Sequence, residues 1–341
     1  MKLSEIGEFH FIDRLKALFR TEMPSGVVGI GDDCAVIPRE LVDREMLVTS
    51  DLLVEGTHFL RDATSPFDLG YKTLAVNLSD VAAMGGRPQF AFLSLALPKD
   101  VEWEWVEGFL KGFRSIARES SVALLGGDTT KSENIFINVT VIGSGPRRQI
   151  KRRTSAELGD IVAVTGFLGD SAAGLNLIRE KIDRFKDLEK MELSPEELLV
   201  HRHLKPRPHI QEGLWLGRQI EVHAMMDVSD GIHSDLERLK EQSSCGFEID
   251  LDQLPISKEL ASIAQKYNWS VDELATCGGE DYVLLITADP ERFERLSEFF
   301  NSEFGRPLFQ IGRVVGGARN IRFVRGGRDF KLSESGFDHF R

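Results

Sequence analysis

The sequence is poor in the residues that build zinc sites and disulfide frameworks. Its 341 residues include only three cysteines, Cys34, Cys245 and Cys277, which lie far apart. This spacing matches no zinc pattern and no disulfide framework, so a reducing cytoplasm is the expected compartment. Clustered cysteines are missing, whereas aspartates are dense. This composition disfavours transition metals and favours oxygen atoms as the metal ligands.

Long apolar runs and an excess of positive charge are lacking as well. No apolar run is long enough to cross a bilayer, and residues 1–5 do not open a signal peptide. With 42 basic and 54 acidic residues, the net charge is −12. This balance argues against a nucleic-acid partner and against an anionic membrane surface. An acidic protein can still bind phosphates if divalent cations mediate the contact.

The common nucleotide-binding motifs are absent too. The sequence contains no Walker A loop and no catalytic motif of a protein kinase, so any nucleotide must bind to a different scaffold. What the sequence does contain is a series of acidic turns, each beside glycine or at the end of an apolar run. They are Asp33, Asp51, Asp80, Asp128, Asp227, Asp230 and the pair Glu280-Asp281.

These turns predict sites for a hard metal ion. The segment Gly29–Ile37 shows the pattern, with two glycines, two adjacent carboxylates and then a short apolar run. Adjacent carboxylates repel each other, so a folded chain places at least one of them in water or on a cation. Oxygen ligands favour Mg²⁺, which most often serves substrate phosphates. At any single position, a solvated acidic turn is the alternative interpretation.

The apolar spacing over residues 69–84 predicts a helix. Asn77 and Asp80 lie three residues apart on it, so their side chains can point to one place. Lys72 on the same helix could offer a countercharge to a phosphate, but we expect an exposed lysine there.

Residues 122–125 predict a buried strand that runs into a turn at Gly126–Thr130. The N–H groups of that turn could surround a phosphate while its aspartate holds a metal ion. The chain is long enough for two domains with full cores. The basic cluster at 147–153 places the expected boundary between residues 1–147 and residues 148–341, and both halves look like similar α/β units.

Seven segments occur in the order seen in the thiamine-monophosphate kinases: Gly29–Cys34, Thr49–Asp51, Ala75–Asp80, Gly126–Thr130, Asp227–Gly231, Gly278–Tyr282 and Gly336–Phe340. The chain therefore resembles this family. Its superfamily also contains aminoimidazole-ribonucleotide synthetase, selenophosphate synthetase and the hydrogenase-maturation dehydratase. The resemblance implies a two-domain, PurM-like α/β (α+β) fold. It also implies a homodimer whose N-terminal sheets pair into a barrel, and a C-terminal domain with a mixed sheet and flanking helices.

The resemblance also implies roles for individual residues. The positions that match Mg²⁺ ligands are Asp33, Thr49, Ser50, Asp51, Asp80, Asp128, Asp227 and Asp230. Those that match contacts to ATP are Gly127, Asp128, Arg153 and Ser229. The thiamine-phosphate pocket corresponds to His58, Glu280 and Phe337. Some members carry a tryptophan just before the final glycine, and this chain does not, so stacking on thiamine falls to Phe337 or another aromatic residue.

The activity implied is ATP-dependent phosphorylation of thiamine monophosphate to thiamine diphosphate, with several Mg²⁺ ions. The acceptor phosphate is already ionised at neutral pH, since its second pKa is about 6. We therefore expect direct transfer with no catalytic nucleophile and no general base. One alternative is another ATP-dependent superfamily member of the selenophosphate synthetase type, although residues 1–28 lack the cysteine it needs. The other is a non-catalytic assembly protein that binds Mg-nucleotide.

Overall fold

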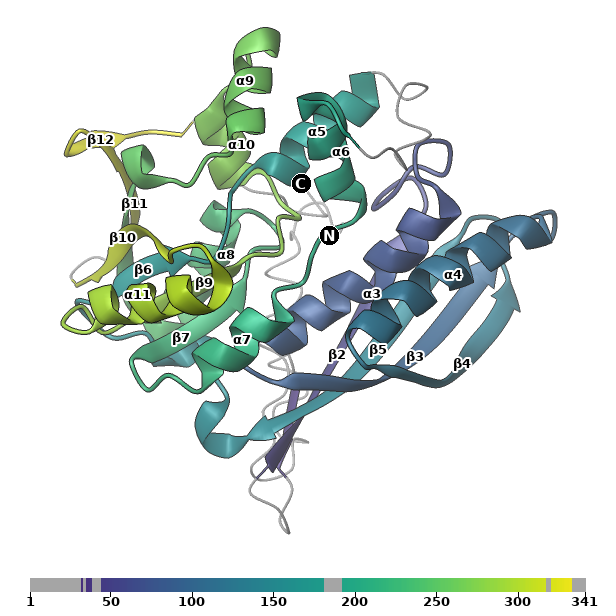
Figure 1. Ribbon diagram of the computed structural model, residues 1–341, viewed down its shortest axis with the longest axis horizontal. Helices are drawn as coiled ribbons and strands as arrows, with labels where there is room; N and C mark the ends of the chain where they lie inside the picture. The colour runs from purple at the N-terminus through teal and green to yellow at the C-terminus, as the bar shows by residue number, and fades with distance from the viewer. Residues whose placement is uncertain (1–31, 33–34, 39–43, 181–191, 317–319, 333–341) are drawn as a thin grey trace, which may run out of the picture.

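The computed structural model describes residues 32, 35–38, 44–180, 192–316 and 320–332. Within these ranges the chain forms two α/β lobes, each built on one sheet (Figure 1).

The N-terminal sheet has the strand order β1-β2-β5-β3-β4. Strands β3 and β4 are parallel, and the other neighbours are antiparallel. The described strands are β1 (Ala35–Pro38), β2 (Arg44–Val54), β3 (Arg87–Leu97), β4 (Ala123–Lys131) and β5 (Phe136–Pro146). Helices α3 (Pro66–Ala83) and α4 (Trp103–Glu119) cover one face of this sheet (Figure 1).

Helix α3 confirms the helix predicted at 69–84 and begins three residues earlier. The Ser65 hydroxyl accepts a hydrogen bond from the Asp68 N–H at 3.0 Å, which caps the helix. The helix is buried on more than one side. Leu78 packs in the core of the N-terminal lobe, and Ala82 packs in a core with Leu216 of the C-terminal lobe. This helix therefore joins the two lobes.

Strand β4 differs from the prediction. Residues 123–125 form a strand as expected, but it is exposed along its length and continues through Gly126–Thr130. The predicted turn is therefore wrong, because this segment pairs with β3 at the edge of the sheet. Gly127 is needed for that pairing, since a Cβ at this position would lie 1.6 Å from the Leu93 carbonyl oxygen.

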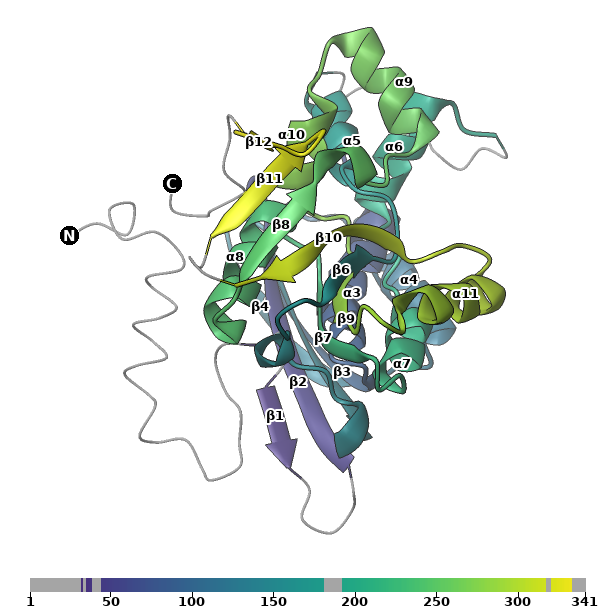
Figure 2. The same ribbon diagram turned by 90° about the vertical axis from the view of Figure 1, so that its left-hand side faces the viewer.

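The face of the N-terminal sheet opposite α3 and α4 is open and partly apolar. Successive side chains of a strand point to opposite faces, so Leu93 packs beneath the helices while its neighbours point away. Phe90 and Phe92 of β3 are 39% and 37% exposed, and Leu52 of β2 is 50% exposed. The described residues cover this face with no helix (Figure 2).

The C-terminal sheet has the order β12-β11-β8-β10-β6-β9-β7. Its strands are β6 (Ile161–Val164), β7 (Val222–Asp227), β8 (Gly246–Asp250), β9 (Leu284–Ala288), β10 (Phe309–Val315), β11 (Ile321–Arg325) and β12 (Arg328–Phe330). The helices of this lobe are α5 (Asp170–Glu180), α6 (Pro195–Leu204), α7 (Ile210–Gly217), α8 (Ile232–Ser243), α9 (Lys258–Tyr267), α10 (Val271–Cys277) and α11 (Phe293–Phe304). None of the described helices is long and apolar enough to cross a membrane.

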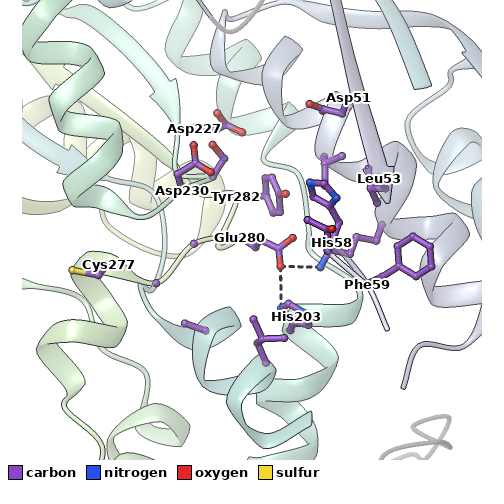
Figure 3. Close-up of a pocket in the computed structure, with 18 of the residues that line it drawn as sticks. Asp51, Leu53, His58, Phe59, His203, Asp227, Asp230, Cys277, Glu280 and Tyr282 are labelled. Atoms are coloured by element: carbon purple, nitrogen blue, oxygen red, sulfur yellow. Dashed lines mark hydrogen bonds and ion pairs between the residues drawn. The ribbon is translucent and has the colours of Figure 1, made fainter. Parts of the chain in front are cut away.

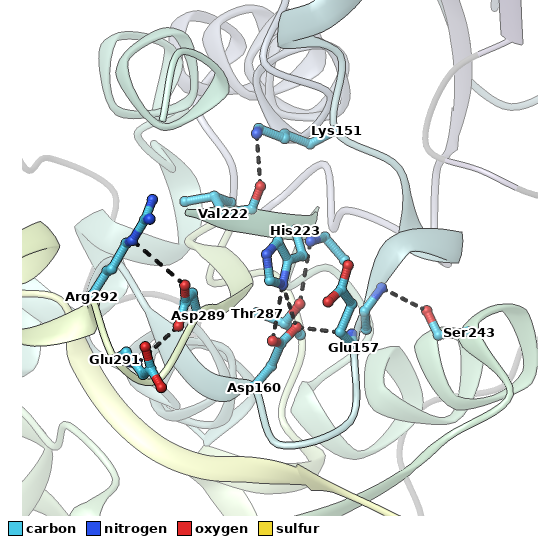
Figure 4. A network of polar contacts seen from close by, with 12 residues as sticks. Lys151, Glu157, Asp160, Val222, His223, Ser243, Thr287, Asp289, Glu291 and Arg292 are labelled. Carbon is cyan, nitrogen blue, oxygen red and sulfur yellow. Dashed lines mark hydrogen bonds and ion pairs between the residues drawn. The ribbon is translucent and has the colours of Figure 1, made fainter. Parts of the chain in front are cut away.

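The connection between the lobes is fixed by a polar network (Figure 4). The Lys151 ammonium group donates hydrogen bonds to the carbonyl oxygens of Gln219 and Val222, each at 2.7 Å. Next to it, His223 is hydrogen-bonded to Asp160 at 2.9 Å. These bonds hold the segment between β5 and β6 against the start of β7. The boundary between residues 147 and 148 stays a prediction.

Helices α3 and α4 cross closely because glycines face backbone atoms at their contact. A Cβ at Gly70 would lie 1.9 Å from the Phe109 carbonyl oxygen, and one at Gly112 would lie 1.8 Å from the Phe67 carbonyl oxygen. Any side chain at either position would push the helices apart.

We expect Gly112→Ala to lower the free energy of unfolding by about 3 kcal/mol, because the helices must separate to admit a methyl group. Gly108→Ala on the same helix is the matched control. Its Cβ would lie 3.0 Å from the Pro66 ring, and we expect a change below about 1 kcal/mol. Urea unfolding followed by circular dichroism measures both. An equal fall in the free energy of unfolding for Gly112→Ala and Gly108→Ala would contradict the close crossing of the two helices.

Candidate active site

A cavity of ≈ 1570 Å³ opens between the two lobes. Strand β2 and helix α3 line it from the N-terminal lobe. Helices α5 and α8 and the segment Cys277–Tyr282 line it from the C-terminal lobe. Figure 3 shows Asp227 and Asp230 across this cavity from Asp51. Carboxylates that are distant in the sequence therefore share one space, as the sequence predicted.

Local hydrogen bonds hold the carboxylates in place. The Asp51 N–H donates to the Asn77 side chain at 3.1 Å, which ties β2 to α3. Asp80 accepts a hydrogen bond from the Thr49 hydroxyl at 2.5 Å. Asp227, at the end of β7, accepts one from the Ser79 hydroxyl at 2.6 Å. Helix α3 thus supplies partners for acids of both lobes.

The electrostatics of this cluster favour a cation. Burial raises the pKa of Asp51 to about 7, and the negative charges of Asp227 and Asp230 add to the effect. Burial and the Asp51 carboxylate raise the pKa of Asp80 well above its ordinary value. Burial also raises the pKa of Asp227. Carboxyl groups that resist ionisation together are stabilised when a positive charge is placed among them.

The donor set fits Mg²⁺ that is shared with phosphates. In the described part of the chain, no three His, Cys, Asp or Glu side chains converge closely enough to hold an ion by themselves. Mg²⁺ sites in nucleotide enzymes typically use one or two carboxylates, with phosphate and water oxygens completing the shell. Asp230 also forms an ion pair with Arg238, which a cation there must compete with.

Glu280 lies at another part of the cavity. It sits in the segment before β9, and its carboxylate is 2.9 Å from the Lys72 ammonium group and 3.2 Å from His203 Nδ1. Lys72 was expected to be exposed, but its side chain is only 2% exposed. That expectation fails because α3 is packed between the sheet and the C-terminal lobe.

His58 lines the cavity beside Glu280 and Tyr282 (Figure 3). Its Nδ1 accepts a hydrogen bond from the Val54 N–H at 3.0 Å, so a neutral His58 carries its proton on Nε2. Asp281 has a different role. It accepts hydrogen bonds from the N–H groups of Gly169 and Ser171 at the start of α5, at 2.6 and 3.1 Å. Burial raises its pKa to about 8.

Arg153 and Ser229, which were predicted to contact ATP, both line the cavity. Arg153 is buried, and its Nε lies 3.6 Å from an Asp32 carboxylate oxygen. Asp32 also lines the cavity, whereas its neighbour Asp33 is the predicted ligand. Asp33 and the predicted stacking residue Phe337 lie outside the described residues.

Asp128 and Gly127 do not join the cavity within one chain. Asp128 lies on β4, where it pairs in register with Ser94 of β3. Strand β4 is three inter-strand spacings, or about 14 Å, from β2. Asp51 is paired with the buried Val139 and so points toward the helices, while Asp128 points to the open face. Ser50 also faces the open side, where its hydroxyl lies 3.0 Å from that of Thr140, but unlike Asp128 it lines the cavity.

Sequence reasoning missed several residues that line the cavity: Asp32, Lys72, His203, Arg238 and Trp269. A signal for Lys72 was present, because Lys72, Val76 and Asp80 recur at four-residue spacing and so share one helical face. Asp32 belongs to the same acidic pair as the predicted ligand Asp33. The remaining residues come from distant segments, and no local pattern links them to the acidic turns.

The comparisons with known proteins agree with this geometry. Two family models match, "AIR synthase related protein, N-terminal domain" over residues 31–144 and "AIR synthase related protein, C-terminal domain" over residues 157–325. The two models define the class of protein: an AIR synthase related protein with both domains present.

Curated relatives narrow this class. The thiamine-monophosphate kinase of Aquifex aeolicus is 39% identical over 319 residues, covering 92% of this chain and 97% of the relative. That of Escherichia coli is 36% identical and covers 98% of each chain. The solved structure "AaThiL complexed with AMPPCP and TMP" matches with a TM-score of 0.83 at 36% identity and covers 99% of each chain. The chain belongs to the thiamine-monophosphate kinase family.

We expect Asp51→Asn to stabilise the metal-free protein at about pH 8 by about 1–3 kcal/mol. The raised pKa means that the folded state holds a proton that the unfolded chain releases above about pH 4, so wild-type stability falls as the pH rises to about 7. The Asp51→Asn variant has no carboxyl group at this position and so does not lose this stability as the pH rises. Near pH 4 the two proteins should be equally stable.

Urea unfolding in a chelating buffer at both pH values measures this difference. Asp100→Asn, at an exposed position outside the cavity, is the control and should leave stability unchanged at either pH. A difference between wild type and Asp51→Asn that does not change with pH would contradict the raised pKa.

Proposed function

We propose that this chain transfers the terminal phosphoryl group of ATP to thiamine monophosphate and releases thiamine diphosphate and ADP in the cytoplasm. The observation that carries the proposal is the cluster of three carboxylates, the half-buried Asp51 and Asp80 and the buried Asp227, in one cavity with the Glu280 ion pair. Family membership and the ATP analogue named with the homologous structure support the same reaction.

Both reactants are anionic, so their mutual repulsion is the main obstacle to transfer. Mg²⁺ bound by Asp51, Asp80, Asp227 and Asp230 would neutralise the phosphate oxygens. An acceptor phosphate oxygen forms the new bond to the γ-phosphorus of ATP while the bond to the bridging oxygen breaks. The chain positions the two anions, and no side chain acts as nucleophile or general base. We retain Asp33, Thr49, Ser50 and Asp128 as further ligand positions.

The remaining predicted contacts divide by position in the cavity. Arg153 and Ser229 lie near the aspartate cluster and would bind ATP, together with Gly127. His58 and Glu280 would bind thiamine monophosphate, and Phe337 stays a proposed stacking residue.

We also propose a homodimer that forms through the open face of the N-terminal sheet. Phe90, Phe92 and Leu52 give this face exposed apolar surface, which monomeric proteins seldom leave uncovered. Asp128 lies on this face, away from Asp51 of its own chain. A second copy packed there would cover the aromatic residues and bring its own Asp128 toward the cavity, which reaches this face at Leu52.

The reaction is tested by mixing the protein with Mg²⁺ and ATP, with and without thiamine monophosphate, and measuring ADP and thiamine diphosphate. We expect ADP release only with thiamine monophosphate, in equal amount to thiamine diphosphate. ADP release without the acceptor would indicate a different superfamily activity. Tight ATP binding without turnover would indicate a nucleotide-binding assembly protein.

The dimer is tested by complementation between two inactive variants. We expect Asp51→Asn and Asp128→Asn each to lower turnover by at least about 100-fold in the isolated proteins. Unfolding and refolding them together in equal amounts should restore about a quarter of the wild-type turnover, because half of the dimers then hold one intact site. If both residues serve the same chain's site, the mixture stays inactive.

A further inference from the structure

Lys72 is a buried lysine that the reaction described above does not use. It lies on α3 of the N-terminal lobe, its side chain is 2% exposed, and its ammonium group is 2.9 Å from Glu280 of the C-terminal lobe. Lysine is almost never fully buried without a partner. Both residues of this pair line the cavity.

Glu280 is held in a strained position. Its backbone φ is +66°, in the left-handed region that non-glycine residues seldom adopt. Its N–H donates to the Ser229 carbonyl oxygen at 2.7 Å, which fixes the backbone. Such strain persists where the surrounding structure holds a side chain in one orientation, and here the fixed side chain is a carboxylate that lines the cavity.

Lys72 provides the charge that keeps this carboxylate ionised. Burial alone raises the pKa of Glu280, but Lys72 is the first of several groups that more than offset this effect, so the pKa lies below its ordinary value. His203 does not share this role at neutral pH. Burial and the Lys72 charge lower the pKa of His203 to about 3, so its imidazole is neutral. Lys72 is thus the positive charge in hydrogen-bonding distance of Glu280 among the described residues.

We propose that Lys72 is a positioning residue that holds an ionised Glu280 against the cationic thiazolium ring of the acceptor. This inference rests on the proposed function. The thiazolium nitrogen carries a permanent positive charge, and a fixed carboxylate at low dielectric attracts it strongly. Without Lys72, the half-buried Glu280 takes up a proton or turns away, and the attraction for the ring is lost.

The test combines Lys72→Met, Glu280→Gln and the double variant. We expect Lys72→Met to raise KM for thiamine monophosphate by about 10- to 100-fold while KM for ATP changes by less than about twofold. The double variant should bind no more weakly than Glu280→Gln alone, because Lys72 acts through Glu280. Calorimetry with an analogue whose ring is neutral should show equal affinity for wild type and Lys72→Met.

Lys111→Met is the matched control, because Lys111 lies on α4 and is 64% exposed. It should leave both KM values unchanged. Lys72→Gln serves as a second variant if Lys72→Met fails to fold, since its amide can still donate a hydrogen bond to Glu280 but carries no charge. The same loss of affinity for thiamine monophosphate is expected from it.

If the double variant loses the summed affinity of the two single variants for thiamine monophosphate, the proposal is overturned, because Lys72 would then contact the ligand itself. The proposal is also overturned if Lys72→Met weakens the binding of ATP, or of the neutral analogue, as much as that of thiamine monophosphate. Wild type that binds thiamine monophosphate without making thiamine diphosphate refutes the proposed reaction, but the calorimetric comparison still decides the role of Lys72. Wild type that does not bind thiamine monophosphate overturns both.

Discussion

The repulsion among the carboxylates that face the cavity is the constraint on which the structure depends. Asp51, Asp80 and Asp227 come from β2, α3 and β7, and burial makes each of them resist ionisation. The apolar cores of two lobes must hold these groups together against that repulsion. A bound cation relieves it, so the same arrangement that weakens the empty protein creates affinity for metal and phosphate.

Helix α3 carries most of this arrangement. It packs against its own sheet, against α4 through two glycine contacts and against α7 of the other lobe. Its residues line the cavity both at the aspartate cluster and at Glu280. Asp80 joins the carboxylate cluster, Ser79 holds Asp227, and Lys72 pairs with Glu280. Because α3 is covered on several sides, its polar residues face other parts of the protein, whereas on a surface helix they would face solvent.

Predictions from the sequence succeeded where the sequence pattern was local. The spacing of Asn77 and Asp80 placed them on one face of a helix, and acidic turns at strand ends indicated a shared cavity. The strand at Gly126–Thr130 was missed because only its pairing with β3 makes it extended. The burial of Lys72 was missed because periodicity within α3 does not show which other elements cover it. The face to which Asp128 points depends on sheet register, which spans distant segments.

The two anchored turns of the C-terminal lobe have a consequence for ligand geometry. The Glu280 N–H is bonded to the Ser229 carbonyl oxygen at 2.7 Å, and the Tyr282 N–H to that of Val228 at 2.9 Å. The segment with Glu280 and the turn with Asp227 therefore move as one piece. The distance between Glu280 and the aspartates is therefore fixed. A ligand that binds to Glu280 at one end can place its other end at the aspartates only if it has the matching length, so the cavity selects ligands by length as well as by charge.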